Sequence, residues 1–285
     1  MPGTASPAVS RTAGSRAAPP RCAAAYFPGD SPLASEPVLR DYLADLTEPY
    51  GVPLREDLLA AGVGHSYGEM GEELLRAVVA EDDPVDLLIL PFAMPDVRPG
   101  RSTALYLSSV CPGRPEAFAI SDQGFAAPFT AIRLAGTYLA TGECRSALVL
   151  VLEQSVLHHA PLLGEGETAP PLPERHAGVA LRFDGSVPQV SQYTDVDADD
   201  AAQRVARLDS AQPSVFVLGA GLADVAVSGE VIRPKGQPLT GIWTAYAEHA
   251  ERWISERRRV VLADYDAGMR TLSLCVFATE HGGAG

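Results

Sequence analysis

The chain has 285 residues, of which 46% are hydrophobic and 20% are charged, so it can bury a sizeable core as one large domain or two closely packed ones. Its 22 basic and 36 acidic residues give a net charge of −14. This balance argues against a nucleic-acid backbone or an anionic membrane surface as the main partner, because both attract clustered Lys and Arg. No apolar run approaches the ~20 residues that a membrane-spanning helix needs.

The N-terminal segment and the cysteines indicate the cellular setting. Residues 1–21 are rich in Ala, Pro, Ser, Gly and Arg and lack the apolar stretch of a secretory signal, so we expect a disordered tail. The cysteines Cys22, Cys111, Cys144 and Cys275 form no metal or redox motif. We expect reduced thiols in a cytoplasmic protein, with no metal and no cofactor.

Short apolar runs bounded by Pro, Gly or charged residues predict buried strands along the chain. In the first part these runs are residues 85–91, 117–120, 146–152 and 178–183. In the second part they are residues 214–219, 259–263 and 271–277. Helices are predicted at 125–140, which is Ala-rich and almost uncharged, and at 240–255.

The order of these elements repeats, which predicts an α/β fold with mostly parallel strand pairing. The repeat divides the chain into an N-terminal half, residues 22–184, and a shorter C-terminal half, residues 185–285. This division is inferred from the order of the elements and not from residue identities.

One motif is typical of serine hydrolases. Gly64-His65-Ser66-Tyr67-Gly68 matches the GxSxG nucleophile elbow, in which a strand leads directly into the serine. Residues 58–63 are a poor strand, because Ala is depleted in strands, and they follow a run that resembles a helix start. A serine hydrolase or thioesterase that acts through Ser66 is therefore an alternative hypothesis.

Three other patterns have structural interpretations. Gly219-Ala220-Gly221 lacks the third glycine of a dinucleotide-binding loop. The run at 195–199 imitates a calcium loop but lacks its glycine and its final glutamate, so we expect Asp199 to cap a helix. His158 and His159 follow the strand at 146–152 and have no metal-ligand partner at suitable spacing.

A basic patch lies at the end of the predicted helix 240–255 and consists of Arg252, Arg257, Arg258 and Arg259. Cations at this place complement the negative end of the helix dipole. Alternatively, they form a docking surface for an acidic carrier protein or for a phosphate group.

Taken together, the blocks of the sequence resemble the thiolase superfamily, specifically its ketoacyl synthase III branch. The matching blocks are residues 86–96, like the strand before the family's TPD turn; 116–127, like its nucleophile elbow; 134–153, like the next helix and strand; 175–181, like a further strand; 236–241, like its Gly-Asn turn; and 264–269, like its glycine-rich final hairpin. The resemblance implies a thiolase-like fold, in which two similar βαβ-type halves form a layered α-β-α-β-α architecture.

The resemblance also implies where the family's Cys-His-Asn triad would lie, with the cysteine accepting an acyl chain. The nucleophile position falls at Gly124 if counted from the preceding strand, or at Phe125 if counted from the following helix. The histidine position falls at Gly219, and the helix that normally follows it is missing. The asparagine position is Gln237. All three members of the triad are replaced, which excludes condensation through an acyl-cysteine.

Three functional hypotheses follow. The first is a non-condensing subunit that pairs with an active ketosynthase in polyketide or fatty-acid-type natural-product biosynthesis. The second is an atypical acyltransferase or decarboxylase, in which Asp122, Gln123 or Gln237 acts in a remodelled acyl pocket. The third is the hydrolase that uses Ser66.

The expected partners follow from the first two hypotheses. Both imply acyl-carrier protein or acyl-CoA as ligand. Proteins of this superfamily usually form dimers through the strand and helix beside the nucleophile turn, so we expect a homodimer or a heterodimer with an intact ketosynthase.

Overall fold

The computed structural model of the chain describes residues 19–31, 36–160, 171–209 and 214–277. Of the predicted tail, residues 1–18 lie outside the described residues, and Arg21 already belongs to the first strand. None of the helices in the described ranges combines the length and the apolar character needed to cross a bilayer.

The first part of the chain contains five strands and the helices between them. In chain order these are β1 (Arg21–Tyr26), α1 (Pro37–Thr47), η2 (Glu48–Tyr50), α2 (Glu56–Ala60), α3 (Tyr67–Val78), β2 (Leu87–Pro91), α4 (Thr103–Val110), β3 (Glu116–Ile120), η3 (Gly124–Ala126), α5 (Ala127–Thr141), β4 (Ser146–Glu153) and β5 (Ala177–Asp184).

The second part contains five further strands. Its elements are β6 (Gln189–Tyr193), α6 (Ala198–Asp209), β7 (Ser214–Leu218), η4 (Ala220–Leu222), β8 (Glu230–Ile232), α7 (Gly241–Ser255), β9 (Arg259–Asp266) and β10 (Thr271–Phe277). Between β7 and β8 the structure describes only the 3-10 turn η4, so the helix expected to be missing after Gly219 is absent there.

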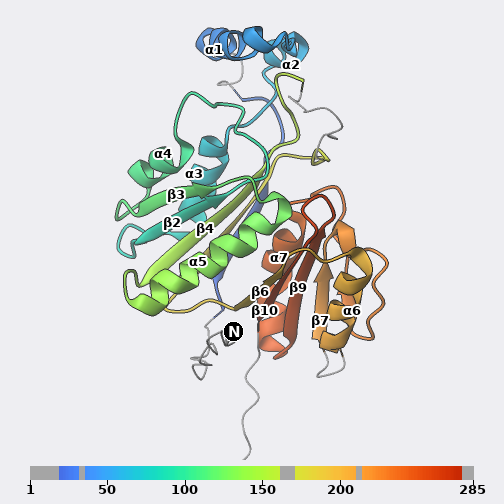
Figure 1. The fold of residues 1–285 in the computed structure, drawn as a ribbon. Coiled ribbons are helices and arrows are strands. Elements are labelled where there is room, and N and C mark those ends of the chain that lie inside the picture. The colour runs from blue at the N-terminus through green and yellow to red at the C-terminus, as the bar shows by residue number, and fades with distance from the viewer. Residues whose placement is uncertain (1–18, 32–35, 161–170, 210–213, 278–285) are drawn as a thin grey trace, which may run out of the picture.

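The strands form two five-stranded sheets, in the orders β1-β5-β4-β2-β3 and β6-β10-β9-β7-β8 (Figure 1). The predicted α/β fold of two similar halves is confirmed. The prediction of mostly parallel pairing is wrong, because β5 and β10 run antiparallel to both neighbours. β10 follows β9 through the short turn 267–270, and such a direct return gives antiparallel pairing; between β4 and β5 the described residues contain no helix.

The main core lies between the two sheets and is filled by α5 and α7. Both helices have 15 residues and contact each other through the edge-on rings of Phe129 and Trp243, whose centroids are 5.0 Å apart. Both helices bury most of their side chains because they are covered on two faces, which explains why α5 carries almost no charge.

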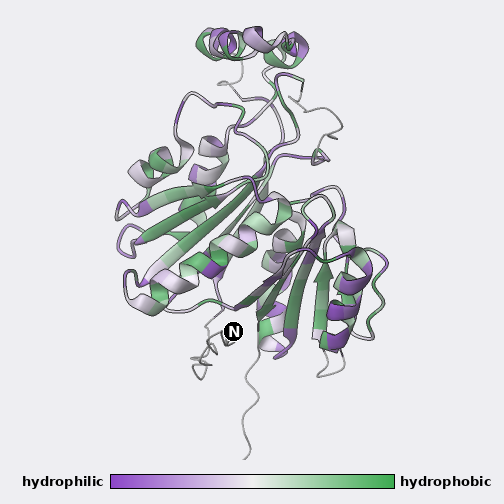
Figure 2. Ribbon diagram, viewed as in Figure 1, coloured by the Kyte–Doolittle hydropathy of each residue, from purple (hydrophilic) through white to green (hydrophobic). Residues whose placement is uncertain are grey.

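The outer faces of the sheets are covered by separate helices. The side chains of α3 pack on the first sheet and those of α6 on the second, each with its own apolar cluster, and Figure 2 shows hydrophobic strands beneath both helices. The predicted cap of α6 is wrong by two residues. Asp197 Oδ1 accepts the Asp200 N–H at 2.8 Å, whereas Asp199 lies inside the first turn.

One arginine is buried in the first sheet. Arg182 is 1% exposed and donates to Asp83 Oδ1 at 2.6 Å and to Asp184 Oδ1 at 3.2 Å. Arg21 pairs with the same two carboxylates at 2.6 and 3.1 Å. These ion pairs fasten the start of β1 to the end of β5.

Candidate functional site

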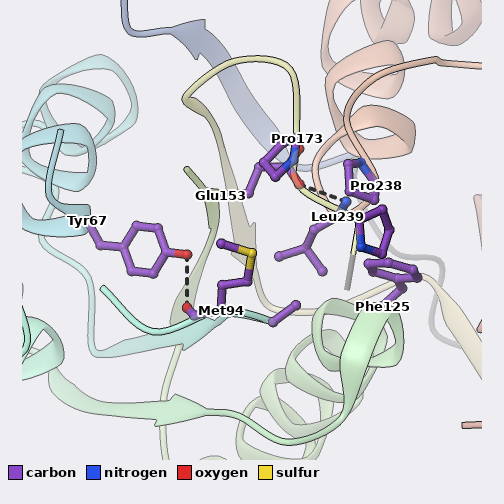
Figure 3. Close-up of a pocket in the computed structure, with 9 residues that line it drawn as sticks. Tyr67, Met94, Phe125, Glu153, Pro173, Pro238 and Leu239 are labelled. Carbon is purple, nitrogen blue, oxygen red and sulfur yellow. Dashed lines mark hydrogen bonds between the residues drawn. The ribbon is translucent and has the colours of Figure 1, made fainter. Parts of the chain in front are cut away.

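A small cavity lies where the end of β4, the start of α5 and the turn before α7 meet (Figure 3). Its lining residues are Tyr67, Ala93, Met94, Phe125, Glu153, Pro171, Pro173, Pro238 and Leu239. Most of the lining is apolar, and the space holds about one water molecule. The cavity as it stands is therefore too small for an acyl chain.

Glu153 is the one carboxylate in the lining of this cavity. It is 5% exposed and accepts hydrogen bonds from Gln237 Nε2 at 2.8 Å, from the Leu239 N–H at 2.9 Å, and from both the N–H and the hydroxyl of Thr240. Burial raises the pKa of the Glu153 carboxyl, although these hydrogen bonds lower it. Since Thr240 is the N-cap residue of α7, Glu153 binds the positive end of that helix.

The predicted nucleophile position lies beside the same cavity. Phe125 places its ring in the cavity lining, and its N–H donates to Asp266 Oδ2 at 3.1 Å. The Met269 N–H donates to the other oxygen of Asp266 at 3.0 Å. Gly124 has a φ of +50°, and a Cβ atom there would overlap the Asp266 carboxyl. The space in which a side chain of residue 124 would lie is thus filled by Asp266.

The predicted histidine position has the same arrangement. A Cβ atom on Gly219 would overlap the carboxyl of Asp264, which comes from the neighbouring strand β9. Asp264 is 4% exposed, and its Oδ1 accepts the Tyr265 N–H at 2.9 Å. Burial, together with the charge of Asp266, raises the pKa of Asp264 to about 7.

Gln237, at the predicted asparagine position, holds two segments of the chain together. Its Oε1 accepts the Arg175 N–H at 3.0 Å, and its Nε2 donates to Arg175 O at 3.1 Å as well as to Glu153. Gln237 is buried and does not line the cavity. Its polar atoms are therefore engaged within the chain.

The other two candidates at the elbow do not reach the cavity. Asp122 is exposed, has a φ of 60° and accepts a hydrogen bond from Ser121 Oγ at 2.7 Å. Gln123 Oε1 accepts the Thr130 hydroxyl at 2.6 Å, which fixes the amide against α5. Neither residue belongs to the cavity lining.

The four cysteines are free thiols, and none is set up as a nucleophile. Burial raises the pKa of Cys22 and of Cys111 to about 11 and also raises the pKa values of Cys144 and Cys275. A reactive thiolate needs the opposite shift, as a nearby cation or a helix N-terminus provides.

Ser66 is a helix cap. Its hydroxyl accepts the Glu69 N–H at 3.2 Å, and the Glu69 carboxylate accepts the Ser66 N–H at 2.8 Å, which together form a capping box at the start of α3. The described segment before it is the short helix α2 and its turn, so the strand that a nucleophile elbow needs is absent at this place.

His158 is a buried structural histidine. Its Nε2 lies 2.6 Å from Val63 O, so this nitrogen carries the proton. Its neighbour His176 accepts the Ser155 N–H through Nδ1 at 3.1 Å, and burial lowers the pKa of His176 to about 4. Across the described ranges, no group of three or more His, Cys, Asp or Glu side chains could hold a metal ion.

The predicted basic patch is largely neutralised within the chain. Arg252 and Arg258 pair with Glu230 at 3.0 and 3.4 Å. Arg259 donates to Ser214 Oγ at 2.8 Å and is half-buried. Arg257 has no ion pair with any residue that the structure describes.

Three acidic residues at the site escaped sequence reasoning, namely Glu153, Asp264 and Asp266. All three lie within or at the end of strands whose other residues are mostly apolar. A carboxylate that interrupts a buried-strand pattern is the sequence signal that could have identified them. Their partners in distant segments could not be read from that signal.

Solved structures of ketosynthases share this fold. The chain is similar to a tetronic acid condensing enzyme, AbyA1, at 16% identity over 90% of this chain and 98% of that one, with a TM-score of 0.60. It is similar to the 3-oxoacyl-(acyl carrier protein) synthase III of Pseudomonas aeruginosa PAO1, at 15% identity over 93% of this chain and 98% of that one, with a TM-score of 0.54. It is also similar to the synthase III of Aquifex aeolicus VF5, at 13% identity over 74% of this chain and 84% of that one, with a TM-score of 0.54. The chain has the thiolase-like, ketoacyl synthase III-like α/β fold.

No protein-family model matches the sequence, and no curated protein does. At identities of 13–16%, the likeness to the solved structures establishes the fold and leaves the activity to be inferred from the site.

Proposed function

We propose that this chain is a non-condensing, ketosynthase III-like subunit that pairs with an active ketosynthase in polyketide or fatty-acid-type natural-product biosynthesis. One observation carries the proposal. The carboxyls of Asp266 and Asp264 fill the space beside Gly124 and Gly219, where the resemblance places the nucleophile and the histidine.

The chemistry of the site supports this role. Condensation through an acyl-cysteine needs a thiolate, and the oxyanion of its transition state needs free N–H donors. Here the Phe125 N–H is bound by Asp266, whose negative charge opposes any further anion at that place. A carboxylate is also a weak acceptor for an acyl group from a thioester, because the product would be a reactive anhydride.

The proposed partner surface is the open edge of the first sheet. Among the described strands, β3 pairs only with β2, which leaves one row of its N–H and C=O groups without a strand. Ala119 on this strand and Leu105 and Val110 on the adjacent helix α4 are exposed. We propose that β3 and α4 take part in the dimer, with acyl-carrier protein or acyl-CoA bound by the active subunit, in the cytoplasm.

The first experiment tests the subunit role. The chain is co-expressed with an active ketosynthase from the same genomic neighbourhood, and the complex is measured by size-exclusion chromatography with light scattering. We expect a heterodimer that Ala119→Arg disrupts, whereas Ile254→Arg, at an exposed position elsewhere, leaves it intact. A stable homodimer that does not exchange subunits with the ketosynthase would contradict the proposal.

The second experiment tests the absence of condensation. The chain alone is incubated with acyl-CoA and malonyl-CoA, and intact mass and CoA release are recorded. We expect no covalent acyl adduct and no release of CoA. An adduct on any of the four cysteines would overturn the proposal.

A second candidate function is the atypical acyltransferase or decarboxylase. It is favoured by Asp264, whose pKa of about 7 lets a carboxyl both accept and donate a proton near neutrality. In that case the chain alone decarboxylates malonyl-CoA and Asp264→Asn abolishes turnover. Asp122→Ala and Gln123→Ala would then leave turnover unchanged, because Asp122 is exposed and the Gln123 amide is held by the Thr130 hydroxyl.

A further inference from the structure

Helix α1 carries apolar side chains on two neighbouring faces. Leu39 and Leu43 are buried against Leu59 of α2. Beside them lie Val38, Tyr42, Leu46 and Tyr50, which are 77, 43, 42 and 68% exposed. These four side chains, spaced four residues apart along α1 and η2, are here named the α1 ridge.

A surface helix normally presents one apolar stripe to its own core and polar side chains elsewhere. Here the apolar stripe of Leu39 and Leu43 is buried against α2, while the α1 ridge faces solvent. Figure 1 shows that α1 and α2 stand away from the two sheets, and Figure 2 shows hydrophobic residues on α1 among hydrophilic ones. A contiguous exposed apolar strip of this kind marks an interaction surface.

The α1 ridge has an acidic border on the side away from α2. Successive residues of a helix are turned by 100°, which places Asp41, Asp45 and Glu48 along one flank of the ridge, opposite to the flank that borders the buried leucines. All three side chains are exposed. Asp41 lies 3.8 Å from Arg40, whose closer partner is Glu56 at 2.6 Å. Within the described part of the chain, Asp45 and Glu48 have no cationic partner.

We propose that the α1 ridge docks onto a partner protein that presents an apolar surface bordered by Lys and Arg. An amphipathic helix offers anchors at this spacing to such a surface, and opposite charge at the rim sets the choice of partner. A second copy of this chain is disfavoured, because it would bring the same acidic border and a net charge of −14. An anionic membrane is disfavoured for the same reason. This surface is independent of the proposed dimer edge at β3.

The test uses the full-length chain and two synthetic helical peptides with the same leucine pattern, one with lysine and one with glutamate at the polar positions. Binding is measured by calorimetry at low and moderate salt. We expect the Leu/Lys peptide to bind and the Leu/Glu peptide not to bind. The variant Val38→Ser/Leu46→Ser/Tyr50→Ser should weaken binding about ten-fold while its circular dichroism stays unchanged.

Two matched variants separate the apolar and the electrostatic contributions. Asp41→Asn/Asp45→Asn/Glu48→Gln should weaken binding several-fold and flatten its salt dependence. Ile254→Ser removes an exposed apolar side chain elsewhere and should leave the affinity unchanged.

Three outcomes overturn the proposal. The first is equal affinity of the chain and the ridge variant for the Leu/Lys peptide, or equal binding of the two peptides. The second is concentration-dependent self-association, seen by ultracentrifugation, that the ridge variant abolishes. The third is ridge-dependent binding to phosphatidylglycerol vesicles, which would assign the surface to a lipid.

Discussion

The two halves of the molecule share one arrangement of strands but differ in what surrounds it. In both halves the order and direction of the five strands correspond one to one, and α3 and α5 of the first half correspond to α6 and α7 of the second. The first half adds α1, η2 and α2, and its eight-residue helix α4 is matched in the second half by η4, of three residues.

The correspondence extends to two acidic residues at the centre. Glu153 ends β4 and accepts the Leu239 and Thr240 N–H groups before α7, while Asp266 ends β9 and accepts the Phe125 N–H before α5, so each carboxylate binds the start of a helix from the opposite half. Each half therefore supplies the anion that neutralises the other half's central helix. The comparison teaches that the carboxylate at the expected nucleophile position is one member of a reciprocal pair, and not an isolated substitution.

The largest expected effect tests whether the two acids are equal. Glu153→Ala removes the common acceptor of four buried hydrogen bonds, which come from Gln237, Leu239 and Thr240, and should cost about 3–5 kcal/mol of unfolding free energy. Asp266→Ala, at a half-buried site, should cost about 1 kcal/mol. Urea unfolding of the two variants measures both values, and equal losses would show that the pair is symmetric in energy as well as in position.

The second prediction concerns the filled space at the expected histidine position. Gly219→Ala should destabilise the chain by about 2–3 kcal/mol, because its methyl group would overlap the Asp264 carboxyl. Asp264→Gly in the same chain should recover most of that loss. A double-mutant cycle by urea unfolding measures the coupling, and additive effects would argue against the overlap.

The third prediction uses the pKa of Asp264 in the second half. The folded-state pKa of about 7 lies above the ordinary value of 3.8, so this group favours folding at low pH and the benefit is lost as pH rises towards 7. Relative to the unmodified chain, Asp264→Asn should therefore gain about 2–3 kcal/mol of unfolding free energy between pH 5 and pH 8. Thermal unfolding across this range checks the difference, and a pH-independent effect would contradict the assigned pKa.

The fourth prediction concerns the smallest effect, in the first half, where stability is lost as the pH falls and not as it rises. The pKa of His176 is lowered from 6.5 to about 4. The neutral histidine therefore contributes to the free energy of unfolding above pH 6.5, and this contribution is lost as the pH falls through 4. His176→Asn keeps an acceptor for the Ser155 N–H and should reduce the loss of unfolding free energy between pH 7 and pH 4 by about 2 kcal/mol. Unfolding between pH 4 and 7 is the measurement; an unchanged acid profile would remove His176 from the explanation.

The elements that could be predicted from the sequence are those buried on both faces. The predicted strand at 146–152 is β4, Ser146–Glu153, because a strand covered on both sides is apolar at every position. Strand β1 was missed since its sequence, RCAAAY, has little β-propensity and is held by pairing with β5.

The resemblance drew attention to two glycine positions, but it could not indicate which side chains lie beside them. The resemblance indicated that Gly124 and Gly219 stand where the family has its cysteine and its histidine. Glycine is required at both positions because the carboxyls of Asp266 and Asp264 occupy the space of a side chain there. The carboxyls come from β9, and the bond from the Phe125 N–H to Asp266 spans 141 residues. Contacts at such separation depend on how the two sheets face each other, which no local pattern specifies.

In both halves the first strand pairs with the last: β1 with β5, and β6 with β10. On the ribosome, β1 therefore emerges long before its partner and waits until residue 184 has been made, when Arg21 can meet Asp184. A nascent chain arrested before β5 exposes β1 and one edge of β4, both open to pairing with other chains. All five strands of the first sheet can therefore pair before the second half is made, whereas the core around α5 is completed only when α7 arrives.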